Sequence, residues 1–150
     1  MTFEIVKLRD EIDRNRVDET YHQWIFNCYR QLTDAPEISW YDFRHIVTNL
    51  PRLHEIYVYR LEDKPVALIT LIIEQKLIHS GSRVGHIEDL VVDAAYRGQG
   101  IAKRLIEYCI RQSQIHGCYK VILDCKPELV DFYKGHNFEQ GGAYMLFKIS

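Results

Sequence analysis

Residues 86–104 read HIEDLVVDAAYRGQGIAKR, an apolar run that carries two acids and ends in a glycine-rich basic turn. The residues after the turn have helical periodicity. A helix that begins at such a turn offers free backbone N–H groups, and its dipole favours an anion there. Positive side chains are supplied by Arg97, Lys103 and Arg104. The stretch therefore predicts an anion-binding strand–loop–helix junction, most naturally for phosphate groups.

Common nucleotide-binding motifs do not match this turn. It lacks the third glycine of the dinucleotide fingerprint, and it lies two-thirds of the way along the chain instead of after a first strand. The sequence Gly-x4-Gly-Lys-Ser/Thr of nucleotide P-loops is also missing. From these residues alone, a plain turn before a surface helix with solvated charges is an equally good interpretation.

Length and charge limit the class of protein. A chain of 150 residues fits one domain, and 47% hydrophobic with 27% charged residues is typical of globular proteins. The formal charge of -2 argues against nucleic acid or an acidic membrane as a partner, so any anion site must be a local cluster. No apolar run approaches the ~20 residues that cross a bilayer, and the N-terminus has no signal-like region, so a cytoplasmic protein is expected.

The cysteines do not indicate a metal site or a nucleophile. None forms a Cys-x-x-Cys pair, so reduced thiols are expected. His116, Cys118 and Cys125 have a spacing that fits no common zinc site. We therefore expect no metal and no covalent acyl-cysteine. The four cysteines are Cys28, Cys109, Cys118 and Cys125.

The N-terminal half is predicted to contain helices with capped starts, followed by a hairpin. Asp18 can cap a helix with one apolar face, and Ser39 with Asp42 resembles the capping box of a second helix. Two strands rich in branched residues then follow, joined by a short polar loop. The expected strands lie at residues 3–8, 56–61 and 66–77.

The C-terminal half is predicted to alternate strands and helices. The helix after the glycine turn has an apolar stripe and ends at Gly117, and Pro127 can start a short helix. Since strand, helix and strand follow one another, the two strands should be parallel and joined by a crossover. The expected strands lie at residues 84–92, 120–123 and 143–149. The fold class is therefore α/β (α+β), a mixed sheet with the order β-αα-βββ-α-β-α-β.

Residues 97–102 resemble the (Gln/Arg)-x-x-Gly-x-(Gly/Ala) pyrophosphate loop of the GNAT N-acetyltransferases, which bind acetyl-CoA. The flanking sequences resemble one branch of that superfamily, the glucosamine 6-phosphate N-acetyltransferases. These flanks are GHIED at residues 85–89, GCYKVILDC at 117–125, and Phe132-Tyr133. The resemblance implies a single GNAT domain over residues 1–150, with a sheet that splays in the middle to admit the pantetheine arm.

The resemblance also implies an activity. A member of this branch transfers acetyl from acetyl-CoA to the amine of glucosamine 6-phosphate, a step toward UDP-N-acetylglucosamine. Because no nucleophile is evident, we expect direct attack by the amine without an acyl-enzyme. The resemblance further implies a homodimer whose last strand reaches the partner's sheet and brings a basic residue to the partner's phosphate site.

Acetyl transfer to an amine requires loss of an ammonium proton and protonation of the leaving thiolate. Tyr133 is a neutral donor at pH 7, and the resemblance implies that it protonates the thiolate. The alternative is that Tyr133 is one of ten tyrosines and simply packs on a short helix. Two adjacent acids in an apolar strand require partners, which a cationic amine provides. The resemblance implies that Glu88, Asp89 and Asp124 surround this amine and that Asp124 helps to take its proton; the alternative is a salt bridge to Lys120 or Arg83.

The binding residues follow from the same match. The oxyanion donor is expected to be a backbone N–H near Leu90. The cofactor-binding set implied is Leu90, Val91, Val92, Arg97, Gly98, Gln99, Gly100, Ile101, Ala102, Lys103 and Tyr133. The substrate-binding set implied is Thr33, Lys76, His79, Glu88, Asp89, Tyr119, Lys120, Asp124 and Lys148.

Three residues depart from the pattern of the branch. Lys148 stands where relatives often carry arginine, which keeps the charge but loses the bidentate fork. Leu129 replaces an asparagine that bonds the cofactor, and Asn137 replaces a glycine. Two rival functions remain: an acetyltransferase of this fold for a polyamine or a protein N-terminus, and a non-catalytic module that binds CoA.

Overall fold

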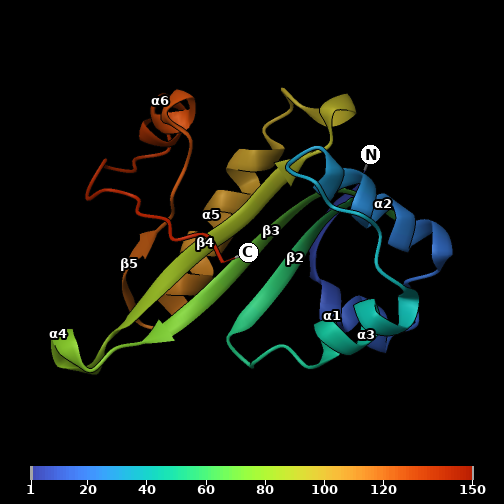
Figure 1. The fold of residues 1–150 in the computed structure, drawn as a ribbon, viewed down its shortest axis with the longest axis horizontal. Helices are drawn as coiled ribbons and strands as arrows, with labels where there is room; N and C mark the ends of the chain where they lie inside the picture. The colour runs from blue at the N-terminus through green and yellow to red at the C-terminus, as the bar shows by residue number, and fades with distance from the viewer. Residues whose placement is uncertain (1, 150) are drawn as a thin grey trace.

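The computed structural model of the chain describes residues 2–149, and Figure 1 shows their arrangement. The strands are β1 (Phe3–Lys7), β2 (His54–Leu61), β3 (Lys64–Gln75), β4 (Arg83–Val92) and β5 (Cys118–Ile122). The helices are α1 (Leu8–Asp13), α2 (Glu19–Arg30), α3 (Trp40–Thr48), α4 (Ile78–Gly81), α5 (Ile101–Ile115) and α6 (Val130–Lys134), with 3-10 turns η1 (Ala94–Tyr96) and η2 (Pro127–Leu129). Helix α1 and the one-turn helix α4 are additions to the predicted elements.

The five strands form one mixed sheet in the order β1-β2-β3-β4-β5. Neighbours from β1 to β4 are antiparallel, whereas β4 and β5 are parallel. Helix α5 joins these two parallel strands, as the crossover rule predicted. The predicted helix caps are also present, since Asp18 accepts a hydrogen bond from the Tyr21 N–H and Ser39 accepts one from the Asp42 N–H. The predicted fold class is confirmed.

Helices cover the two faces of the sheet separately. On one face, Val58 and Leu68 pack against α1, α2 and α3, for example against Ile25. On the other face, Ile69 and its neighbours pack against α5, for example against Leu105. The alternation of adjacent residues Leu68 and Ile69 between the two cores follows from the two-residue period of a strand. Figure 1 shows α2 and α3 at one side of the sheet, so part of the face over β3, β4 and β5 carries no helix.

The sheet opens in the middle of β4. Strand β5 pairs with β4 only as far as His86, where His86 lies opposite Ile122, and β4 then continues to Val92 with β3 as its partner on the other side. In the same region the register with β3 shifts, and Asp89 has a φ of 50°. One extra residue on β4 with a left-handed backbone is a β-bulge, which bends a strand and breaks its ladder. This opening is the splay that the resemblance implied.

The predicted last strand, residues 143–149, is wrong for the isolated chain. This segment has no regular structure, and its side chains are exposed, with Phe147 89% exposed. Figure 1 shows the segment passing in front of β4 instead of running along the outer edge of β5. An extended segment becomes a strand only where a sheet edge receives its backbone hydrogen bonds. The apolar pattern is present, but no edge within residues 2–149 is used by it.

Candidate active site

The glycine turn between η1 and α5 presents unpaired backbone donors. Gly98 and Gly100 both have a φ of 78°, which favours glycine, and α5 begins immediately afterwards at Ile101. Among residues 2–149, none accepts a hydrogen bond from the N–H groups of residues 98–103. A Cβ atom added at either glycine would meet nothing within 4 Å, so the space in front of the turn is open. The turn can therefore receive an anion along its backbone.

Arg104 fixes the orientation of this turn. Its Nη1 donates to the carbonyl oxygen of Gln99 at 3.2 Å and to the hydroxyl of Tyr59 at 3.3 Å. Its guanidinium carbon also lies 5.0 Å from the centre of the Phe3 ring. In a trans peptide the carbonyl and the following N–H point in opposite directions, so the Gly100 N–H points away from Arg104. Phe3 on β1 and Tyr59 on β2 thus hold Arg104 in the position in which the Gly100 N–H points outward.

The acids of β4 and β5 lie within electrostatic reach of one another. Glu88 is half-buried on β4, and burial raises the pKa of its carboxyl, with further increases from the charges of Asp124 and then Asp89. Asp124 is exposed and follows the end of β5. Asp89 is also exposed, and burial together with the Asp89 charge raises the pKa of the Tyr29 phenol on α2. The charges of Asp124 and Asp89 therefore both act on Glu88, and a cation near these acids would offset their repulsion.

Tyr133 lies within electrostatic reach of Asp124. It is half-buried on α6, and its ring contacts Phe132 and Phe138 at centroid distances of 5.0 and 5.8 Å. Burial raises the pKa of the Tyr133 phenol, followed by the effects of Cys125 and Asp124. Asp124 thus influences both Glu88 and Tyr133, which come from different elements. A phenol in this position keeps its proton at neutral pH and can donate it.

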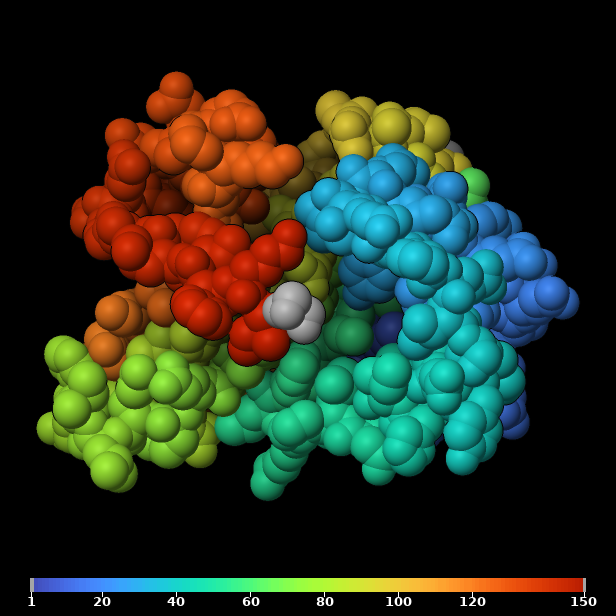
Figure 2. Space-filling model, in the orientation of Figure 1, coloured from blue at the N-terminus to red at the C-terminus, as the bar shows by residue number. Residues whose placement is uncertain are grey.

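The free edge of β4 continues this site. Val91 and Val92 pair with Leu68 and Ala67 of β3 on one side, but β5 has already diverged on the other side. The backbone of this edge can therefore accept an added extended ligand. Figure 2 shows a hollow in this face between the C-terminal segment (red) and the segment that joins α2 to α3 (cyan).

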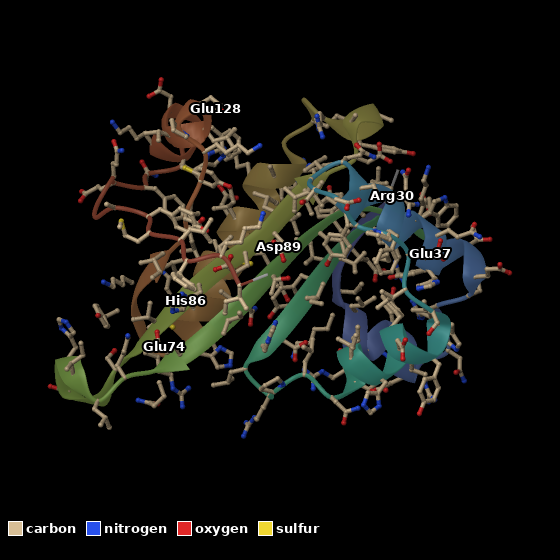
Figure 3. All side chains as sticks on the ribbon, in the orientation of Figure 1. Arg30, Glu37, Glu74, His86, Asp89 and Glu128 are labelled. Carbon is tan, nitrogen blue, oxygen red and sulfur yellow. The ribbon has the colours of Figure 1, made fainter. Side chains whose placement is uncertain are left out.

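The remaining predicted substrate residues form a second group near the start of β4. The His79 ring stacks on the Tyr119 ring with centroids 4.2 Å apart, and the Lys120 ammonium lies 5.4 Å from the same Tyr119 ring. Lys76 forms a salt bridge of 2.9 Å with Glu74. The group lies toward the start of β4 and the acids toward its end, and His86, which contacts Glu74, stands between them on β4. Figure 3 shows Glu74 at one end of the sheet and Asp89 farther along it.

Among residues 2–149, no hydrogen bond or salt bridge joins Thr33 or Lys148 to either group. Thr33 is exposed in the bend after α2, and its N–H donates to the Tyr29 carbonyl. Lys148 is exposed in the C-terminal segment. Sequence reasoning also missed one pair, His86 and Glu74, whose side chains are 2.8 Å apart. The only sign of this pair in the sequence is that Glu74 and His86 are polar residues within two apolar stretches that pair as neighbouring strands.

The rest of the described chain contains no further group of predicted site residues. A cavity of about 740 Å³ lies between the starts of α2 and α3 and is lined by Asp18, His22, Glu37 and Trp40, none of them a predicted site residue. Within residues 2–149, no three His, Cys, Asp or Glu side chains are placed to hold a metal ion. In the same range, no helix has both the length and the apolar character needed to cross a membrane.

Comparisons with known proteins agree with this geometry. Residues 17–138 match the family described as acetyltransferase (GNAT) family. A glucosamine 6-phosphate N-acetyltransferase of Candida albicans is 34% identical over 149 residues, covering 97% of this chain and 93% of the relative. A probable glucosamine 6-phosphate N-acetyltransferase 2 of rice, Oryza sativa subsp. japonica, is 36% identical over 138 residues, covering 87% of this chain and 83% of the relative. The crystal structure of glucosamine-6-phosphate N-acetyltransferase from Arabidopsis thaliana superposes with a TM-score of 0.87 at 30% identity and full coverage of both chains.

Proposed function

This chain belongs to the acetyltransferase (GNAT) family, whose members use acetyl-CoA, and we propose that it acetylates the amine of D-glucosamine 6-phosphate. The products are N-acetyl-D-glucosamine 6-phosphate, a precursor of UDP-N-acetylglucosamine, and CoA. Residues 1–150 act as one acetyltransferase domain. The observation that carries the proposal is the divergence of β5 from β4 after His86, an opening at which Glu88 and Asp89 follow on β4 and Asp124 follows the end of β5.

The proposed cofactor site extends from the glycine turn to the edge of β4. The N–H groups of residues 98–103 bind the diphosphate of CoA, supported by the charges of Arg97 and Lys103. The pantetheine arm pairs with the backbone of residues 90–92 as an added strand. A backbone N–H near Leu90 then donates to the thioester oxygen as negative charge develops on it.

Replacing Gly100 with alanine tests the turn. The φ of 78° strains any residue with a Cβ atom, at a cost of roughly 1–2 kcal/mol, and moves the amides that hold the diphosphate. We expect the KM for acetyl-CoA to rise about tenfold with little change in kcat, as for a lost binding contact. Gly117→Ala is the matched control, because Gly117 has a φ of 74° and equally open surroundings but lies at the other end of α5. An equal rise in KM for both variants would assign the effect to general strain.

The proposed chemistry is one direct displacement. The ammonium of the sugar loses a proton to Asp124 or Glu88, directly or through water. The free amine attacks the thioester carbon, so that a C–N bond forms and the C–S bond breaks. The departing thiolate takes the proton of the Tyr133 phenol, and the attacking nitrogen gives up its extra proton, which restores the phenol. A burst of acetyl-enzyme before steady turnover would contradict this order of events.

We also propose that the protein is a homodimer in which each chain contributes residues to the substrate site of the other. The exposed C-terminal segment carries Tyr144, Leu146, Phe147 and Ile149, which are 67–89% exposed. Such a segment fits the sheet of a second copy, where it becomes the missing strand and brings Lys148 to the phosphate of the partner.

Deleting residues 143–150 tests this assembly. We expect the full chain to be a dimer and the shortened chain a monomer with little activity, measured by light scattering and thiol release. Lys148→Ala is the companion variant, which keeps the apolar strand and should remain a dimer with a raised KM for glucosamine 6-phosphate. A shortened chain that is still dimeric would disprove the strand exchange.

The activity itself is tested by following free thiol released from acetyl-CoA. We expect rapid release with glucosamine 6-phosphate and much slower release with glucosamine, spermidine or a peptide with a free N-terminus. Faster release with spermidine or the peptide would instead support an acetyltransferase for another amine. Intact thioester with every acceptor would support a module that only binds CoA.

A further inference from the structure

A single carboxylate connects a lysine and a histidine beside the second group of substrate residues. Glu74, near the end of β3, contacts Lys76 Nζ with its Oε2 atom at 2.9 Å and His86 Nε2 with its Oε1 atom at 2.8 Å. Hydrogen bonds from Lys76 and then His86 lower the pKa of the Glu74 carboxyl, which is therefore ionised. Figure 3 shows the Glu74 and His86 side chains next to each other on the sheet.

These three side chains are accessible to a solute. The side chains of His86, Lys76 and Glu74 are 28%, 32% and 41% exposed, and they lie on the part of the sheet that no helix covers. The charge on this group changes with the proton of His86. With a neutral imidazole the three groups sum to zero, and with an imidazolium they sum to one positive charge.

Charged groups of both signs lie around His86. Glu88 lies two residues along the same strand, therefore on the same face, and the charge of His86 opposes the rise in the pKa of Glu88. On β5, Ile122 lies opposite His86. Lys120 is two residues before Ile122, and Asp124 is two residues after it, just beyond the end of the strand. Glu74 comes from β3, and Lys76 comes from the turn after it. Protonation of His86 therefore adds positive charge among groups of both signs.

We propose that Glu74 and His86 together set the strength with which Lys76 binds the phosphate of the substrate. This inference rests on the proposed function. The Lys76 ammonium has three donors, so it can keep Glu74 and still donate to a phosphate oxygen. The negative charge of Glu74 then opposes the phosphate, and the positive charge of a protonated His86 offsets Glu74. Phosphate binding and protonation of His86 favour each other, because such coupling is reciprocal.

Two substitutions with opposite expected effects test the proposal. His86→Gln keeps a donor for Glu74 but carries no charge, so at pH 6.0 it should raise the KM for glucosamine 6-phosphate about fivefold, the effect of one charge a few ångströms away. The difference between the two proteins should become smaller at pH 8.5, because only a charged imidazolium can offset the charge of Glu74. Glu74→Gln removes the opposing charge and should lower the KM about fivefold at pH 6.0.

The measurement is steady-state thiol release at saturating acetyl-CoA, with each variant compared to the unaltered protein at the same pH. The phosphate and amine of the sugar titrate identically in every comparison and cancel from the ratio. His116→Gln, outside the site at the end of α5, is the control for the substitution itself. Simple damage to the sheet would raise the KM in both variants, and a His86→Gln effect that is equal at pH 6.0 and 8.5 would exclude the proton; either result overturns the proposal. Absence of thiol release from the unaltered protein would instead reject the proposed function.

Discussion

Phenylalanine in place of Tyr133 is expected to lower kcat about 100-fold and to leave the KM for acetyl-CoA within about twofold. The substitution removes only the hydroxyl, so the ring contacts with Phe132 and Phe138 remain. The thiolate then leaves without a positioned proton donor, which affects the chemical step and not the binding of the cofactor. Stopped-flow measurement of thiol release at saturating substrates, together with CoA binding by calorimetry, separates these two effects.

Tyr41→Phe is the matched control, because Tyr41 is 76% exposed on α3, away from the acids. It should leave kcat unchanged. Since burial raises the pKa of the Tyr133 phenol, loss of its proton should not reduce the rate of the unaltered enzyme anywhere below pH 10. A Tyr133→Phe variant with nearly full kcat would remove this residue from the mechanism.

Asparagine in place of Asp124 is expected to lower kcat/KM about 100-fold, because the amide cannot take the ammonium proton. The variant should also change the pH profile. Glu88 retains the part of its raised pKa that is due to burial, but it loses the increase caused by the Asp124 charge. The acidic limb of the profile should therefore move to lower pH. Asp131→Asn, an exposed acid on α6, is the control and should change neither quantity.

The same substitution should raise thermal stability at neutral pH. A carboxyl whose pKa is higher in the folded state stabilises that state when it is protonated, and this contribution is lost as the pH rises through the folded pKa. Above that pH, the mutual repulsion of Glu88, Asp89 and Asp124 opposes folding. Asp124→Asn removes part of this repulsion, so its Tm should exceed that of the unaltered protein at pH 7.5, with a smaller difference at pH 4. A lower Tm at pH 7.5 would show that Asp124 has stabilising partners.

Much of the fold was readable from short local signals. Asp18 and Ser39 begin their helices as predicted, because a side-chain oxygen before a helix satisfies a free N–H. The crossover between β4 and β5 followed from the order of elements alone. The glycine turn was placed correctly because a φ of 78° at Gly98 and Gly100 is a property of those two residues and needs no tertiary contact.

The features that the sequence did not predict depend on the whole molecule. The bulge at Asp89 is visible only once β3 and β4 are paired, because the extra residue exists relative to the partner strand. Helix α1 follows β1 without a break and is held by the buried contact of Glu11 with Arg60, which are far apart in sequence. The strand expected at residues 143–149 has the right pattern, but within residues 2–149 it pairs with no sheet edge, although the outer edge of β5 is free.

The edge of β4 that β5 leaves open also affects how readily the cofactor-free protein aggregates. Unsatisfied backbone groups on an inner strand can pair with any extended peptide, including the same strand of another copy. In the proposed complex the pantetheine arm occupies this edge. Bound acetyl-CoA would therefore also protect the open edge. In a cell poor in acetyl-CoA, the enzyme would lack its substrate and would also be more prone to aggregation and proteolysis.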